Sequence, residues 1–199
     1  MDNDFVNRKD RIIASAIEVI SESGLSSLTT KTLAMKGNMT EELLYRYFGS
    51  VDEILVEVVD TFTKFDSSMI ATVESKEISH LDKVLELLTT LCTYYENYYE
   101  LAAIALNYEE LLHNVNTREA IASSIHTRTS FIRKELELAM SEGEIIDKFT
   151  PEELANLFLG GLARDLLNRR IAYDKKTHSQ VGKATMNKLA DLIRIEQDS

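Results

Sequence analysis

Residues that break helices are nearly absent from this chain. Its 199 residues include one proline and seven glycines, whereas leucine, alanine, glutamate and lysine are plentiful. Proline and glycine disfavour a helix interior, and the four plentiful residues favour it. No useful length of the sequence alternates polar and apolar residues, as a half-buried strand would. The sequence therefore predicts an all-α protein.

Capping signals divide the chain into about nine predicted helices. Thr29, Thr40 and Ser50 each precede a helical pattern in the way an N-cap does. The clearest start is Thr150 followed by Pro151 and Glu153, a capping box with proline at the first helical position. The predicted helices cover residues 4–23, 30–36, 41–47, 51–74, 80–99, 101–113, 117–143, 151–173 and 180–195.

The two short helices near the N-terminus form a recognisable unit. Gly37, Asn38 and Met39 join them in a tight turn, for which glycine and asparagine supply the backbone freedom. Leu33 and Leu44 give both helices an apolar underside. Two short helices joined in this way predict a helix-turn-helix. We expect a DNA-binding domain at residues 1–50 and a larger helical body at residues 51–199.

The charge of the chain limits which partners are expected. The formal net charge is −11, but residues 1–51 hold six Lys/Arg and seven Asp/Glu and contribute only −1. Phosphate attraction is the sequence-independent part of DNA affinity. A near-neutral head on an acidic body therefore permits DNA binding of modest affinity through local basic spots.

The cysteine content and the hydropathy of the sequence indicate in which cellular compartment the protein is expected. Cys92 is the only cysteine, so no disulfide forms within the chain, and a reducing, cytoplasmic setting is favoured. The acidic N-terminus leads into no apolar secretory core. No stretch reaches the roughly 18 apolar residues that a membrane span needs. We expect a cytoplasmic protein with no membrane partner.

The first fifty-five residues resemble the TetR family of bacterial regulators. The most specific match is Leu44-Tyr45-Arg46-Tyr47-Phe48, and other matching residues are Arg11, Ile12, Ile13, Ala16, Gly24, Thr29, Leu33, Ala34, Asn38, Met39, Thr40, Ser50, Glu53, Ile54 and Leu55. The segment from Ser141 to Glu152 also looks like the entry to that family's dimerising helices. The resemblance implies a ligand-responsive transcriptional regulator without enzymatic activity or cofactor, commonly a homodimeric repressor. A small-molecule effector, which the sequence does not identify, would release it from a palindromic double-stranded DNA operator.

The resemblance also implies which head residues meet DNA. In a helix-turn-helix the N-terminal residues of the second helix meet base edges, and hydroxyl and cationic groups contact phosphates. The expected DNA-binding residues are Thr29, Thr30, Lys31, Lys36, Thr40, Glu41, Glu42, Tyr45, Arg46 and Tyr47.

Two departures from the family pattern leave alternatives open. Glu41 and Glu42 stand where a neutral or basic residue and then a small one are common, and Val51 replaces a common phosphate-binding lysine. The carboxylates either read C·G pairs by accepting from cytosine N4 or repel the duplex. If they repel it, the chain is a TetR-fold dimeric ligand-binding module with weakened or lost DNA binding.

Aromatic residues in the central helices predict an effector pocket in the body of each subunit. Apolar walls with a few polar groups are typical of small-molecule sites. The candidate lining residues are Phe62, Phe65, Tyr95, Tyr99, Tyr108, His126, Phe131 and Phe158.

The last two predicted helices carry apolar faces suited to self-association. Paired across a two-fold axis, they would make a four-helix bundle. The expected interface residues are Leu154, Leu157, Phe158, Gly161, Leu162, Leu166, Val181, Leu189, Leu192 and Ile193.

A carboxylate-bridged metal protein is the enzymatic alternative. Glu77/His80 and Glu110/His113 have the Glu-x-x-His spacing used on helices of such proteins. Glu77 and His80, however, span a predicted helix start and would not share a helical face. We therefore expect no metal site.

Overall fold

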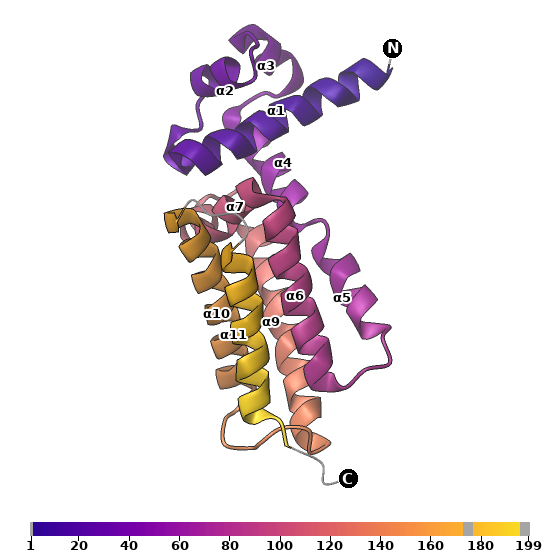
Figure 1. Cartoon of the computed structure of the whole chain (residues 1–199). Coiled ribbons are helices and arrows are strands. Elements are labelled where there is room, and N and C mark those ends of the chain that lie inside the picture. The colour runs from indigo at the N-terminus through magenta and orange to yellow at the C-terminus, as the bar shows by residue number, and fades with distance from the viewer. Residues whose placement is uncertain (1, 173–176, 196–199) are drawn as a thin grey trace. The chain divides into compact units, whose positions relative to one another are not determined.

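The computed structural model describes residues 2–172 and 177–195 as helices joined by short connections (Figure 1). In chain order the elements are α1 (Asp2–Ser23), η1 (Leu25–Ser27), α2 (Thr30–Lys36), α3 (Glu41–Tyr47), α4 (Val51–Thr63), α5 (Asp66–Glu74), α6 (His80–Asn97), η2 (Tyr99–Leu101), α7 (Ala102–Leu106), α8 (Tyr108–His113), α9 (Arg118–Ser141), α10 (Pro151–Ala172) and α11 (Thr177–Ile193). The predicted all-α fold is confirmed. Within those ranges, no helix is long and apolar enough to cross a bilayer.

The chain forms two compact units. Unit 1 comprises residues 1–64 and 99–123, and unit 2 comprises residues 65–98 and 124–199. These units group residues by their packing, and the expected division into a DNA-binding domain at residues 1–50 and a body at residues 51–199 stays a prediction.

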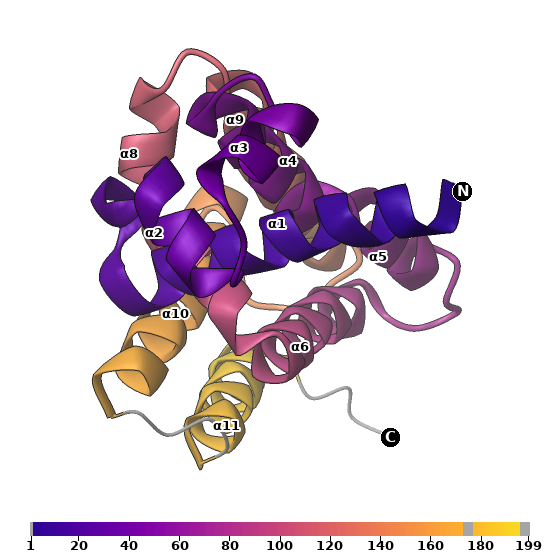
Figure 2. The same ribbon diagram turned by 90° about the horizontal axis from the view of Figure 1, so that it is seen from above.

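Helix α1 organises unit 1, where it packs against α2, α4, η1 and α7. Its buried face carries Ile12, Ala16 and Ile20, which recur at helical spacing. Seen from above, α2 and α3 lie over α1 (Figure 2). Helices of seven residues are not stable alone, and these two are held by the buried side chains of Leu33 and Leu44.

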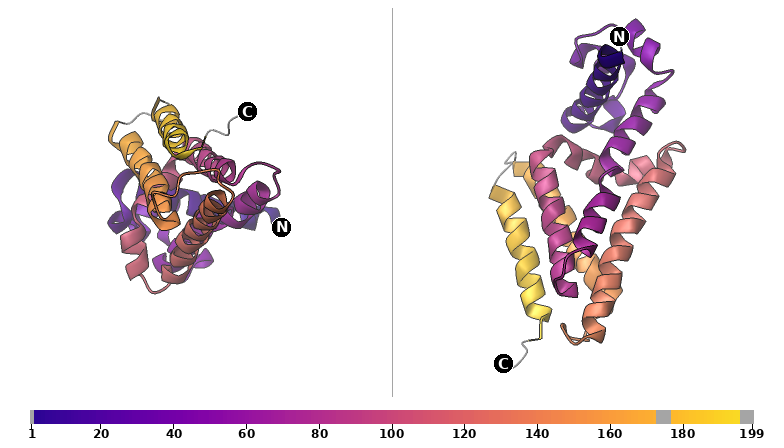
Figure 3. Two further views of the ribbon diagram at one scale, coloured as in Figure 1. Left: turned by 90° about the horizontal axis from the view of Figure 1, so that it is seen from below. Right: turned by 90° about the vertical axis from the view of Figure 1, so that its right-hand side faces the viewer.

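Unit 2 is built around α6, which packs against α5, α10 and α11. Helices α10 and α11 also pack on each other, and Figure 3 shows both running beside α6. The fully buried side chains of Leu88, Phe158 and Ala190 come from these three helices. At the end of α11 the chain pairs with the α9–α10 connection, where the Ile146 amide donates to the Ile193 carbonyl and the Ile195 amide donates to the Glu144 carbonyl, both at 2.8 Å.

The predicted long helix over residues 51–74 is wrong in one respect, because Lys64 and Phe65 interrupt it. The side chain of Asp66, the first residue of α5, is buried. It accepts hydrogen bonds from Ser124 Oγ at 2.5 Å and from Arg128 Nη2 at 2.6 Å. The start of α5 is thereby fastened to α9, a long-range contact that apolar spacing does not reveal.

The predicted helix over residues 101–113 is also divided, into η2, α7 and α8. Asn107 separates the last two, and its side-chain amide donates to the Ala103 carbonyl at 2.6 Å. Elsewhere the predicted bounds agree within about three residues, except that Tyr173 lies outside the described residues. The Thr150 capping box is confirmed, because Thr150 Oγ1 accepts from the Glu153 amide and the Glu153 carboxylate accepts from the Thr150 amide.

Candidate nucleic-acid interface

The first short helix of the predicted helix-turn-helix begins at a reciprocal cap. Thr29 Oγ1 accepts from the Thr32 amide at 3.2 Å, and Thr32 Oγ1 accepts from the Thr29 amide at 3.0 Å. The sequence predicted Thr29 as the cap but not its partner, since a capping box usually ends in Glu or Gln.

The turn between α2 and α3 is tight, as the sequence predicted. Asn38 has a φ of 48°, in the left-handed region that asparagine tolerates better than most residues. The Met39 amide then donates to the Ala34 carbonyl at 3.0 Å. This turn fixes the direction in which α3 leaves α2.

Helix α3 is anchored beneath and exposed above. Thr40 Oγ1 caps it by accepting from the Leu43 amide at 3.2 Å, and the Leu44 side chain is buried. Tyr45 on the outer face is 57% exposed, and Arg46 is exposed too. A short helix whose outer side chains stand free of the core can enter a groove.

Glu41 and Glu42, the first two residues of α3, have different surroundings. Thr30 Oγ1 donates to Glu41 Oε2 at 2.5 Å, so the Glu41 carboxylate links α3 to α2. Glu42 is instead one of the residues that line a crevice between α3 and α1. The structure therefore separates two carboxylates that the sequence treated as one pair.

Lys36, one of the predicted phosphate ligands, is already engaged. Its Nζ lies 2.7 Å from Glu22 Oε1 and 3.3 Å from Glu18 Oε2, both on α1. The hydrogen bond that Lys36 donates to Glu22 raises the pKa of the Lys36 ammonium. Lys36 thus fastens α2 to α1, whereas Lys31 is exposed.

Helix α4 begins with valine at the position where a phosphate-binding lysine is common. Ser50 Oγ accepts from the Glu53 amide at 3.2 Å, and Glu53 Oε2 accepts from the Gly49 amide at 2.7 Å. The predicted cap is present, although the glutamate bonds the residue before Ser50. Val51 is the first helical residue and brings no charge.

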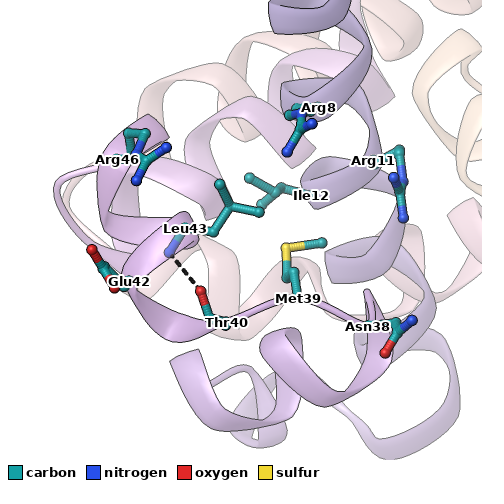
Figure 4. Close-up of a pocket in the computed structure, with 9 residues that line it drawn as sticks. All are labelled: Arg8, Arg11, Ile12, Asn38, Met39, Thr40, Glu42, Leu43 and Arg46. Atoms are coloured by element: carbon teal, nitrogen blue, oxygen red, sulfur yellow. Dashed lines mark hydrogen bonds between the residues drawn. The ribbon is translucent and has the colours of Figure 1, made fainter.

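A crevice of about 290 Å³ runs alongside α3 (Figure 4). Arg8 and Arg11 of α1 stand across it from Arg46 of α3, over Ile12 and Leu43 (Figure 4). Its remaining lining residues are Asn38, Met39, Thr40 and Glu42. Sequence reasoning missed Arg8 and Arg11 as candidates for an interface, although their spacing of three places both on one face of a helix.

The predicted effector-pocket residues fall in both units, so the pocket they would share stays a prediction. Unit 1 holds Phe62, Tyr99 and Tyr108, and unit 2 holds Phe65, Tyr95, His126, Phe131 and Phe158. Tyr95 is buried and its hydroxyl accepts from Arg128 Nη1 at 2.9 Å. His126, in contrast, is exposed.

The predicted interface residues of α10 and α11 lie on two different faces. Leu154, Phe158, Leu162, Leu166 and Ile193 are buried within the single chain. Leu157, Val181 and Leu192 are between 48% and 77% exposed. A methyl group on Gly161 would meet the Met186 side chain of α11, so that glycine serves packing within the chain.

His80, one of the residues considered above for a metal site, lies in unit 2. His80 Nδ1 lies 2.7 Å from the buried Glu135 carboxylate, and this hydrogen bond raises the pKa of His80. Glu144 accepts from the His80 and Leu81 amides and so caps α6. Among the described residues, no group of three or more His, Cys, Asp and Glu side chains is placed to hold a metal ion.

The head is similar to known bacterial regulators. Residues 12–58 match the family model described as "Bacterial regulatory proteins, tetR family". The HTH-type transcriptional regulator LuxR of Vibrio harveyi is 25% identical over 166 residues, which cover 78% of this chain and 75% of that protein.

Solved structures show the same fold along almost the whole chain. The ketosteroid transcriptional regulator KstR2 of Mycobacterium tuberculosis superposes with a TM-score of 0.81 and 16% identity, covering 95% of this chain and 96% of that one. The regulator FadR of Bacillus subtilis, solved with stearoyl-CoA, superposes with a TM-score of 0.69 and 19% identity, covering 92% and 95%.

Proposed function

Because the chain carries the helix-turn-helix head of TetR-family transcriptional regulators and shares their fold, we propose that it represses transcription in the cytoplasm as a homodimer on a palindromic operator. A small-molecule effector releases it, and the chain has no catalytic role. The observation that carries the DNA-binding part is α3, which is fastened from below by Leu44 and presents Tyr45 and Arg46 outward.

We propose that Glu42, rather than Glu41, is the carboxylate that faces the duplex. The Glu41 carboxylate already accepts from Thr30, whereas Glu42 is exposed on α3 and lines the crevice there. A carboxylate that reads cytosine N4 contributes about 1–3 kcal/mol of discrimination. Glu42→Gln should then relax preference at one base pair, and Glu41→Gln, the matched control, should leave preference unchanged.

Competition binding with duplexes that differ at single base pairs tests the assignment. If Glu42→Gln strengthens binding to every duplex equally, the carboxylate only repels phosphate and reads no base. If the unmodified protein prefers no duplex at all, the alternative function stands: a dimeric ligand-binding module that has lost its operator.

We propose that the dimer forms through the exposed apolar residues of α10 and α11. Leu157, Ile171, Val181 and Leu192 supply apolar surface on the two helices, and such surface is buried in dimer interfaces. Leu192→Glu should give a monomer by light scattering at micromolar concentration. Val115→Glu, a control at a 79% exposed position of unit 1, should leave the dimer intact.

For the effector, we propose an acyl-CoA thioester as the class to test first. The support is the shared fold with the B. subtilis regulator solved with stearoyl-CoA. A ligand that binds only the native state stabilises it, by about 2.7 kcal/mol at a concentration one hundred times its Kd. The melting temperature therefore rises. A series of acyl-CoA chain lengths that leaves the melting temperature unchanged would rule this class out.

A further inference from the structure

Three helix ends meet at a polar junction in unit 2: the start of α6, the end of α9 and the end of α11 (Figure 1). Glu144, in the connection after α9, joins them. Its carboxylate accepts from the His80 and Leu81 amides at 3.0 and 2.9 Å. Its carbonyl accepts from the Ile195 amide at 2.8 Å. None of these bonds involves the imidazole of His80, so the ring can change the strength of the junction without being its only support.

The imidazole of His80 lies between two carboxylates at the end of α9. Its Nδ1 is 2.7 Å from Glu135 Oε2, and its Nε2 is 3.3 Å from Glu142 Oε1. A neutral imidazole carries one N–H, so one of its nitrogens would turn a lone pair toward a carboxylate. Only the protonated ring donates from both nitrogens. The geometry therefore favours the imidazolium.

Burial makes the contact with Glu135 the stronger of the two. The Glu135 side chain is 3% exposed, whereas that of Glu142 is 57% exposed. Water and salt screen an exposed carboxylate far more than a buried one. The other cation near Glu135 is Lys134, whose Nζ lies 3.8 Å away and whose side chain is 59% exposed. Loss of the His80 proton would thus leave a buried carboxylate with a more distant and more solvated partner, which is costly.

The other charged groups of the junction leave it negative. With Glu135 and Glu142 it holds Glu144, Asp82, Lys134 and Arg194. Asp82, in the first turn of α6, is paired with Arg194 Nη2 at 2.6 Å. Four carboxylates therefore stand against two cations, and a proton on His80 changes the net charge of the junction from −2 to −1. This charge balance favours the same protonated ring that the hydrogen-bond geometry does.

We propose that His80 is a pH-sensitive switch that links the end of α9 to the start of α6. The protonated ring bonds Glu135 and Glu142 at once, whereas the neutral ring releases one of them and the junction opens more often. The bond to Glu135 raises the pKa of His80. The link is therefore complete below about pH 6.5, the ordinary histidine pKa, and weakens as pH rises through the raised value. This switch does not depend on DNA or effector binding.

The first test is an NMR titration of the histidine rings in the full-length protein. The His80 ring should titrate above the ordinary pKa of about 6.5. Glu135→Gln keeps the size of the side chain and removes its charge, so it should lower the pKa of His80. Glu142→Gln, the matched control, should lower it less, because Glu142 is exposed.

The second test measures opening of the junction by amide hydrogen exchange. The protection of the Leu81 and Ile195 amides, corrected for intrinsic exchange, should fall between pH 6 and pH 9. The fall should be about ten-fold for each unit by which the measured pKa of His80 exceeds its ordinary value. His80→Gln should remove this pH dependence. His113→Gln should retain it, because His113 and its neighbour Glu109 are at least 75% exposed.

Each outcome decides for or against the switch, and circular dichroism checks that every variant is folded. A raised pKa in the wild type, lowered by Glu135→Gln, together with pH-dependent protection that His80→Gln removes, supports it. A His80 ring that titrates at or below about 6.5 would overturn it. Protection that is independent of pH in the wild type, or pH dependence that persists in His80→Gln, would overturn it as well. Because no arm contains DNA, these results leave the proposed function untouched.

Discussion

Helices α5 and α9 are joined by two ion pairs of opposite exposure, and the buried one should dominate the stability of unit 2. Asp66 and Arg128 lie 2.6 Å apart with side chains 6% and 8% exposed. Glu74 and Lys134, on the same two helices, lie 3.2 Å apart and are 45% and 59% exposed. The second pair is therefore a matched control for the first.

The magnitudes follow from what each deletion leaves behind. Asp66→Ala leaves the Arg128 guanidinium buried without its carboxylate, a loss that typically costs about 3–5 kcal/mol. Glu74→Ala leaves Lys134 in water, where an exposed pair contributes about 0–1 kcal/mol. Asp66→Ala/Arg128→Met removes both charges and should be less destabilised than Asp66→Ala alone, because no unpaired charge stays buried.

Urea unfolding followed by circular dichroism at one protein concentration measures the free energy of unfolding of the wild type and of each of the three variants. Asp66→Ala should lower the free energy of unfolding by at least about 2 kcal/mol more than Glu74→Ala does, given the ranges for buried and exposed pairs. Equal losses from Asp66→Ala and Glu74→Ala would show that burial of the Asp66–Arg128 pair does not set its contribution to stability. A double variant less stable than Asp66→Ala would contradict this expectation too, because a buried and unpaired Arg128 would then cost less than its removal.

Three further results are expected. The raised pKa of His80 makes its bond to Glu135 stabilising below about pH 6.5, the ordinary pKa, and this stability is lost as pH rises through the folded value. The stability difference between wild type and His80→Gln should thus be larger at pH 6 than at pH 9, and a constant difference would contradict it. Gly182→Ala should destabilise the protein although alanine favours helices, because its Cβ would lie 2.5 Å from the Asp165 carboxyl carbon; thermal unfolding at or above the wild-type temperature would oppose this. Burial raises the pKa of the Cys92 thiol to about 11, so the folded protein should react with a thiol reagent far more slowly than the unfolded chain at pH 8, and equal rates would refute the burial argument.

Local signals in the sequence predicted most of the fold. The starts of α2, α3 and α10 each depend on a side chain and an amide three residues away. Such contacts are readable from spacing alone. The helix-turn-helix was predictable for the same reason, since its turn and its apolar underside are both local.

Contacts between distant residues were not predictable. The break before Asp66 depends on Ser124 and Arg128, far along the chain. Lys36 appeared available to phosphates until the structure brought Glu18 and Glu22 of α1 against it.

Periodicity found the apolar residues of α10 but could not assign their partners. Leu154 and Phe158 face the core of the same chain, and Leu157 faces outward. Residues 154 and 157 are neighbours on a helix surface, so spacing alone merged two faces into one predicted interface.

The central claim, sequence-specific DNA binding by the head, is tested most directly by selecting duplexes from a random pool at low salt with the unmodified protein. We expect an enriched palindrome whose half-sites are about one helical turn, or roughly 34 Å, apart. The enrichment should be lost with Tyr45→Ala, because Tyr45 stands on the exposed face of α3. A folded, dimeric protein that enriches no palindrome would contradict the claim.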